Sequence, residues 1–140
     1  MGIEATVLSV YDGPPRRTTC DISTVLTLSS IAISGTITLH VSARLANQLA
    51  GAMLGDESLR DSIELTDVTR DAMGEFANIV VGSFKPSVSK LVGEPLRMSV
   101  PTVILGKDHV TQTISVGEWS EARIGIDGEV LIIEIVFAED

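Results

Sequence analysis

The sequence predicts an α+β fold in which an antiparallel sheet is covered on one face by two main helices. Most segments rich in Ile, Val, Thr and Leu follow one another with short turns between them, as in antiparallel hairpins. Two other segments repeat their apolar residues at helical spacing. Strands and helices do not alternate regularly, which argues against a doubly wound parallel sheet. The 140 residues are enough for a single domain over 1–140 with a sizeable core.

The first segment, residues 3–11, fits either a helix or a strand. Its β-branched residues favour a strand. The sequence Asp-Gly-Pro-Pro at 12–15 ends the segment in both cases. Its apolar residues lie at i, i+4, i+7 and i+8, which is one helical face: Ile3, Val7, Val10 and Tyr11.

The next segments predict two strands and a short helix. The first strand is expected from residue 21 to about residue 30, and the second over residues 35–40. Ser42 is placed to cap the helix, because its hydroxyl can accept a backbone N–H of the first turn. Gly55 is placed to end the helix, since glycine tolerates the left-handed conformation found there.

The main helix is predicted over 65–84. Thr66 and Asp67 mark its start, and Lys85 followed by Pro86 marks its end, because a residue before proline avoids the helical region. Pro86 could open one further turn through Lys90. Asp127-Gly128 is a typical two-residue hairpin turn. Four strands are expected after the main helix: 96–105, 109–116, 122–126 and 130–137.

The charge balance argues against two classes of partner. Lys and Arg number 10 and Asp and Glu number 19, so the net charge is −9. Such a surface repels nucleic-acid phosphates and anionic membranes, and we expect neither as a partner. The longest apolar run, residues 130–138, is far shorter than the ~20 residues of a spanning helix. With no signal-peptide pattern and one cysteine, we expect a cytoplasmic protein.

The residues most often used as metal ligands are sparse. Cys20 is the only cysteine, and the two histidines, His40 and His109, are far apart in the sequence. Neither histidine has a neighbouring histidine or cysteine, so they are expected to be a strand residue and a turn residue. The sequence therefore predicts no metal or cofactor bound to this chain.

The main helix has two different faces. At about 100° per residue, one face is apolar and packs on the sheet, through Met73, Phe76, Ala77, Val80 and Phe84. The opposite face carries Asp71, Glu75, Asn78 and Gly82.

Glu75 and Asn78 are i and i+3 neighbours on that face, about 4.5 Å apart along the axis. Two glycines flank the pair, Gly74 and Gly82, and each costs about 1 kcal/mol relative to alanine. Either the glycines leave room for a partner to approach, or they pack tightly against a neighbouring element beside an ordinary solvated face.

The run from Asp71 to Gly82, DAMGEFANIVVG, resembles the signature of the CheC/CheX/FliY chemotaxis phosphatases, whose core pattern is Glu-x-x-Asn on a long exposed helix. Within that group the chain is most similar to CheX. Further segments resemble the family in the same order along nearly the whole chain: 3–7 (its first helix), 33–39, 46–55 and 100–107. The resemblance implies a CheX/CheC-like two-layer domain and a helix at the N-terminus.

The resemblance also implies a function, hydrolysis of the aspartyl phosphate on a CheY-like receiver domain. The receiver supplies the phosphoaspartate, a lysine and a divalent metal such as Mg²⁺. Asn78 would orient the attacking water, and Glu75 would pair with the receiver's lysine. Family members pair through a sheet edge, so a homodimer is expected, through the apolar strand 130–137 and its neighbours.

The chain also departs from the family pattern. Residues 12–15 end the first segment early, and Lys85-Pro86 interrupts what is often a longer helix. Only one Glu-x-x-Asn is found, as in CheX. Two other functions remain open: a module that binds a receiver without hydrolysing its phosphate, and a structural adaptor of the FliY type.

Overall fold

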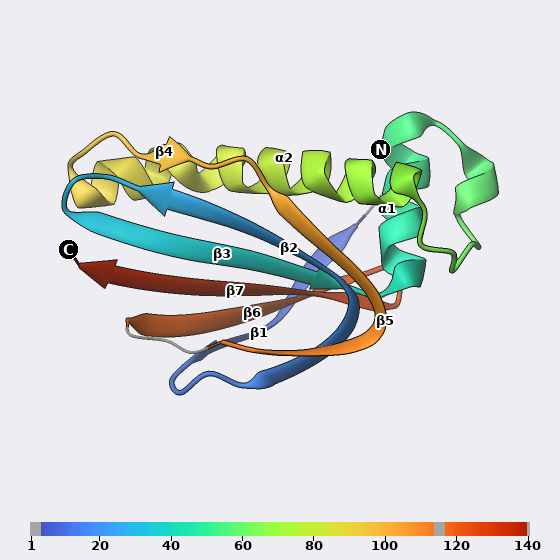
Figure 1. Ribbon diagram of the computed structural model, residues 1–140, viewed down its shortest axis with the longest axis horizontal. Helices are drawn as coiled ribbons and strands as arrows, with labels where there is room; N and C mark the ends of the chain where they lie inside the picture. Colours follow the sequence, from blue (N-terminus) through green and yellow to red (C-terminus); the bar gives the residue numbers. More distant parts are fainter. Residues whose placement is uncertain (1–3, 114–116, 140) are drawn as a thin grey trace.

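The computed structural model describes residues 4–113 and 117–139 (Figure 1). Two helices, α1 (Ala43–Leu54) and α2 (Asp67–Val92), are joined by a short 3-10 turn, η1 (Glu57–Leu59). Seven strands form the rest of the described chain: β1 (Ala5–Asp12), β2 (Arg17–Ser29), β3 (Ile33–Val41), β4 (Arg97–Met98), β5 (Thr102–Gln112), β6 (Glu118–Ile126) and β7 (Glu129–Glu139). No helix in these ranges is long and apolar enough to cross a membrane.

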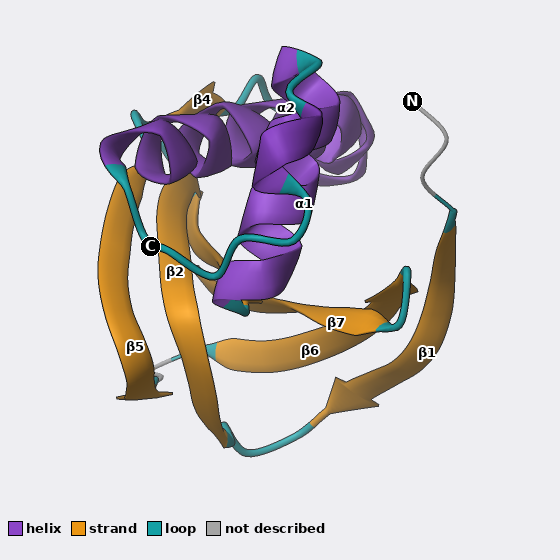
Figure 2. Ribbon diagram, turned by 90° about the vertical axis from the view of Figure 1, so that its right-hand side faces the viewer, coloured by secondary structure: helices purple, strands orange, loops and turns teal. Residues whose placement is uncertain are grey.

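The strands form one sheet in the order β1-β6-β7-β3-β2-β4, with β5 also pairing β2, and the pairs are antiparallel. Figure 2 shows both helices on the same side of a strongly curved sheet, with β1 and β5 at opposite ends. The core lies between, where residues such as Leu26, Ile37 and Leu45 are fully buried. The predicted α+β class, with two main helices on one face, is confirmed.

The ends of both helices show how local sequence sets their limits. Ser42 accepts the N–H of Leu45, and Gly55 follows α1 in the left-handed conformation with φ 67°. Thr66 caps α2 and exchanges hydrogen bonds with Thr69, as in a capping box. The predicted starts of both helices and the end of α1 are therefore confirmed to within two residues.

Residues 4–11, the described part of the first segment, do not contain the helix implied by the family resemblance. The described part of that segment is β1, which pairs with β6 along its length. Its spaced valines have no helical core to meet, since Val7 is 66% and Val10 is 68% exposed. The strand preference of the β-branched residues, together with the pairing to β6, decides the structure.

The main helix does not end before Pro86 but runs through it to Val92. It stops at Gly93, whose φ of 81° is left-handed and whose N–H bonds to the Ser89 carbonyl. Val88, one turn before that end, packs partly buried against the core. Burial beyond the proline outweighs the local penalty, so the predicted end at residue 84 is wrong.

The strands after α2 also differ from the prediction. The expected strand 96–105 is divided into β4 and β5, and β5 continues to Gln112, through the expected turn at His109. Asp108, with φ 53°, lies within β5, and its N–H donates a hydrogen bond to the Asp21 carboxylate on β2. The last part of the expected strand 109–116 falls on residues 114–116, outside the described residues.

The strand expected to offer a sheet edge, 130–137, is an interior strand. β7 pairs with β3 on one side and with β6 on the other, so its backbone groups already have partners. The outermost strand at that end of the sheet is β1, which pairs only with β6. The Asp127-Gly128 turn between β6 and β7 is confirmed, with φ values of 48° and 81°.

Candidate functional site

A buried hydrogen-bond cluster fixes the start of α2 against α1. Thr69, which is fully buried, donates its hydroxyl to Asn47 of α1 at 2.7 Å. The amide of Asn47 donates in turn to the carbonyls of Ser62 and Glu64, at 3.0 and 2.9 Å. Because buried polar groups bonded on all sides allow few alternative arrangements, this contact holds the first turns of α2 rigidly.

The two faces of α2 follow the predicted division. Met73 and Ala77 are buried, and Phe76, Val80 and Phe84 pack partly buried against the core. On the outer face Asp71, Glu75 and Gly82 are exposed and Asn78 is half-buried. The structure therefore brings Glu75 and Asn78 together on the outer face, as their spacing indicates.

Glu75 and Asn78 border a shallow groove of about 370 Å³ between α2 and the chain leading into β5. Within residues 4–113 and 117–139, neither side chain has a hydrogen bond or ion pair inside the chain, so both can meet an outside group. The lining residues are Arg70, Asp71, Gly74, Glu75 and Asn78 of α2, and Val100, Pro101 and Val103 across the groove.

Charged side chains lie at one end of this groove. Arg70 forms ion pairs with Asp67 and Asp71, at 3.2 and 3.4 Å. These pairs are exposed and contribute little to stability. No cluster of three His, Cys, Asp or Glu side chains in the described chain has the arrangement of a metal site.

The two flanking glycines have different surroundings. A Cβ on Gly74 would lie 3.7 Å from Pro101 and 3.8 Å from Val103, which is ordinary contact. A Cβ on Gly82 would have no atom of a neighbouring element within 4 Å. Tight packing within the chain therefore does not account for Gly82.

Sequence spacing did not reveal a second polar cluster, on the side of the sheet away from the helices. The pairing of β2 with β5 shifts register between Cys20 and Ile22, and at this point Cys20 lies 3.2 Å from Ser23. The Ser23 hydroxyl lies 2.8 Å from Nδ1 of His40 and 2.8 Å from Nε2 of His109. His40 lies in a strand as expected, but His109 lies in β5 rather than in a turn, and the sheet brings both histidines to Ser23 although they have no such neighbours in the sequence.

Glu134 of β7 completes this cluster. Its carboxylate contacts Nε2 of His40 at 2.5 Å and accepts hydrogen bonds from Thr113 and Trp119. Burial alone would lower the pKa of His40, but its hydrogen bonds to Cys20 and Glu134 raise that pKa to about 9. Burial would raise the pKa of Glu134, but the bonds from His40, Thr113 and Trp119 lower it to about 2. The two residues therefore form a buried ion pair.

The order Ser23, His40, Glu134 has the connectivity of a hydrolase triad but not its proton arrangement. With His40 protonated, its Nδ1–H donates to Ser23, so it cannot accept the serine proton. The Ser23 hydroxyl then donates to His109, whose Nδ1–H donates to the Gly106 carbonyl at 2.6 Å. Ser23 and His40 are each only 1% exposed. A substrate therefore has no access to Ser23 or His40, and we interpret the cluster as a structural network.

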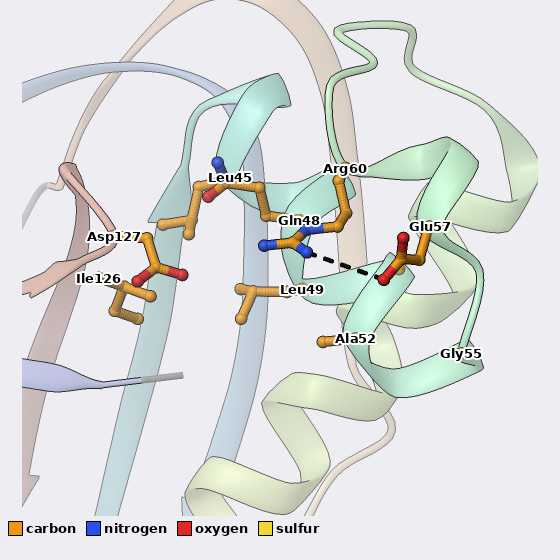
Figure 3. A pocket seen from close by; sticks show the side chains of 10 residues that line it. Leu45, Gln48, Leu49, Ala52, Gly55, Glu57, Arg60, Ile126 and Asp127 are labelled. Carbon is orange, nitrogen blue, oxygen red and sulfur yellow. Dashed lines mark ion pairs between the residues drawn. The ribbon is translucent and has the colours of Figure 1, made fainter. Parts of the chain in front are cut away.

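A more enclosed hollow of about 350 Å³ lies beside α1 and is drawn in Figure 3. Its walls include Leu45, Gln48 and Leu49 of α1, Ile126 at the end of β6, and Asp127 in the turn that follows. At its rim Arg60 pairs with Glu57, 3.9 Å away. None of the residues of the Glu75–Asn78 groove lines this hollow.

The family model described as "Chemotaxis phosphatase CheX" matches residues 22–119, which include the whole groove. No curated protein sequence matches the chain.

Several solved structures share the fold. CheX from Desulfovibrio desulfuricans superposes with a TM-score of 0.81 at 22% identity, over 99% of this chain and 87% of its own. CheX from Vibrio vulnificus gives 0.81 at 21% identity, over 96% and 86%. The CheX-CheY-BeF3-Mg²⁺ complex from Borrelia burgdorferi gives 0.69 at 18% identity, over 95% and 86%. At these identities the likeness is one of fold.

Proposed function

Because the chain belongs to the CheX family of chemotaxis phosphatases, we propose that it accelerates hydrolysis of the aspartyl phosphate on a CheY-type receiver domain. The observation that carries the proposal is the Glu75–Asn78 pair. It lies on the outer face of a helix held rigidly at its start, beside a groove, and neither side chain has a partner in the described chain.

The chemistry explains why two polar side chains are enough. Phosphoryl transfer to water depends mainly on positioning and electrostatic stabilisation, with the attacking and leaving oxygens in line. Asn78 can accept a hydrogen bond from a water and donate one to the phosphoryl group, which holds the water in that line. Nothing on this chain has to act as a nucleophile.

Glu75 has a different role in the proposal. Its carboxylate pairs with the lysine beside the receiver's phosphoaspartate and fixes the relative position of the two proteins. The structurally similar CheX-CheY-BeF3-Mg²⁺ complex, which combines a CheX protein with a CheY protein and Mg²⁺, supports a CheY-type partner. We propose that the metal is held by the receiver's carboxylates, with none bound by this chain.

The test is the decay of phosphate from CheY-type receivers of the same organism, phosphorylated with acetyl phosphate. The chain should shorten the lifetime of at least one phosphorylated receiver, and the Glu75→Ala/Asn78→Ala double variant should not. Glu57→Ala is a matched control, because it removes an exposed carboxylate in η1 that does not line the groove.

Unchanged decay of every receiver, with the chain folded, would refute phosphatase activity. Binding of a receiver carrying BeF3⁻ and Mg²⁺ without hydrolysis would instead identify the chain as a receiver-binding module.

A further inference from the structure

Gly82 differs from the other glycines that the structure describes. Three of them, Gly55, Gly93 and Gly128, have positive φ, which favours glycine. Elsewhere a Cβ would meet other atoms of the chain, for example the Asp56 carbonyl, 2.8 Å from a Cβ at Gly51, and the Phe137 ring at Gly35. Among the described glycines, Gly82 alone has neither a positive φ nor such a neighbour within 4 Å.

Glycine inside a helix is less favourable than alanine, because it loses more backbone freedom on folding. At an exposed helical position where a side chain would meet nothing, the isolated chain gains nothing from glycine. A requirement outside the chain would explain the residue, namely another molecule that approaches the helix backbone closely.

The position of Gly82 says where that molecule lies. Gly82 follows Asn78 by four residues, so the two lie on one stripe about 6 Å apart along the axis. Pro86 has no N–H, so the Gly82 carbonyl also lacks its usual helical donor four residues later. The exposed backbone at Gly82 therefore combines a missing side chain with a carbonyl that can accept a hydrogen bond.

We propose that the main chain of the phosphorylated receiver packs directly on α2 at Gly82, and that this close approach sets how far Asn78 reaches towards the phosphoryl group. The inference rests on the proposed phosphatase function and adds a docking residue to it. A side chain at Gly82 would hold the receiver away from Asn78. A displacement of about 1 Å at a reacting centre can cost on the order of 100-fold in rate.

The test uses a series of increasing size, Gly82→Ala and Gly82→Gln, in the full chain. Ser87→Gln is the matched control, since it adds the same bulk to an exposed position about 140° around α2. We expect Gly82→Ala to slow receiver dephosphorylation by about 10-fold or more, and Gly82→Gln to weaken binding of a BeF3⁻–Mg²⁺ receiver as well. Both variants should melt at the same temperature as the unmodified chain or higher, and Ser87→Gln should retain full activity.

A competing explanation is that Gly82 only accommodates the ring of Pro86, four residues later. In that case Gly82→Ala would lower the melting temperature of the unmodified chain but raise that of a Pro86→Ala variant, and dephosphorylation would be unchanged. Close docking instead requires that Gly82→Ala shifts the melting temperature of the unmodified chain and of the Pro86→Ala variant by similar amounts. It also requires that Gly82→Ala slows dephosphorylation.

The outcomes separate the two proposals. Full activity and receiver binding in Gly82→Gln would overturn the docking role and leave the phosphatase function standing. If the unmodified chain neither binds nor dephosphorylates any receiver, both proposals fail.

Discussion

Glu75 and Asn78 are one turn apart on the same helix face, yet their side chains differ in what they can exchange with a partner. A carboxylate only accepts hydrogen bonds and carries charge, whereas an amide both donates and accepts without charge. Both side chains lack partners in the described chain, so replacing either should change the free energy of unfolding by no more than about 0.5 kcal/mol. Their substitutions therefore report on function rather than on folding.

We predict that Asn78→Ala abolishes accelerated dephosphorylation but leaves receiver binding nearly unchanged, because only the water-orienting amide is lost. Glu75→Ala should reduce both activity and binding, because it removes the contact to the receiver's lysine. Asn78→Asp should be no better than Asn78→Ala, since a carboxylate cannot donate and repels the phosphoryl group. Phosphate decay and binding of a BeF3⁻–Mg²⁺ receiver measure the two effects separately, and full activity of both single variants would place the site elsewhere.

The buried pair of His40 and Glu134 predicts how stability depends on pH. The pKa of His40 is raised to about 9, so its contribution is complete below its ordinary 6.5 and is lost as the pH rises through about 9. The pKa of Glu134 is lowered to about 2, so its contribution is complete above 4.5 and is lost as the pH falls towards 2. The pair should therefore stabilise the fold most between pH 4.5 and 6.5.

Urea unfolding across this range should show a free energy that declines on the alkaline side. In His40→Gln, which does not titrate, the part of that decline due to His40 should be absent and overall stability lower. Glu134→Gln leaves the charge of His40 buried without a counter-ion and should cost about 3–5 kcal/mol near neutral pH. An identical alkaline decline in His40→Gln would show that other groups cause it.

Helical spacing was enough to predict that Glu75 and Asn78 share the outer face of α2, because they lie within one turn of one regular element, whereas their proposed roles come from the family resemblance. The same reasoning failed for His40 and His109. The two histidines meet the same residue, Ser23, because β2 pairs with both β3 and β5 and the register between β2 and β5 shifts near Cys20. Ser23 lies 17 positions from His40 and 86 positions from His109, and contacts at such separations are set by the assembled sheet, which local patterns do not encode.

At the scale of whole elements, α2 shows a conflict between local and tertiary preference. Pro86 lies inside the helix, where its missing N–H and its ring disfavour helix by about 3 kcal/mol relative to alanine. Partly buried Val88 lies beyond it, and the helix continues to the Gly93 cap. Both proline rules used on the sequence are sound locally, and packing beyond the proline overrides them.

We therefore predict that Pro86→Ala raises the free energy of unfolding by about 1–3 kcal/mol, because it restores a helical hydrogen bond. The gain should be smaller than the full propensity difference, since alanine also gives the unfolded chain more freedom. Denaturant unfolding measures this change, and Ser87→Ala, at the adjacent exposed position, is a control for added helix propensity. A loss of stability in Pro86→Ala would mean that the core requires a bend there.

In the N-terminal strand β1, by contrast, the apolar residues have helical spacing but the segment forms a strand. Sequence patterns cannot separate the two in a short segment whose apolar side chains remain exposed, as Val7 and Val10 do. β1 is held by its pairing with β6, at the far end of the chain. By contrast, α1 and the β6–β7 hairpin were predictable, because their limits are set by residues at their own ends.

For the whole molecule, the position of β1 changes where a second copy would bind. β1 has backbone groups on its outer side that no strand of the described chain pairs, and Val7, Leu8 and Val10 are more than half exposed. The predicted homodimer would therefore form through β1 rather than through the interior strand β7.

Light scattering at tens of micromolar should show twice the mass of one chain, and Val10→Lys should yield a folded monomer, because charge at an edge opposes strand pairing. Ser87→Lys, at an exposed position of α2, is a control for a new charge away from β1. A monomer for the unmodified chain at that concentration would rule out the dimer.

We expect the receiver, rather than this chain, to hold the Mg²⁺ ion. In the groove, Asp71 and Glu75 lie one turn apart, and no third ligand stands beside them within the ranges described. A protein-bound Mg²⁺ commonly uses one or two carboxylates together with phosphate oxygens, and here the phosphate is on the receiver. A chelator should therefore stop receiver dephosphorylation without changing the melting temperature of this chain alone, and readdition of Mg²⁺ should restore the rate. A lower melting temperature of the isolated chain in chelator would show that the chain itself holds a metal ion, because loss of a bound ligand destabilises the folded state.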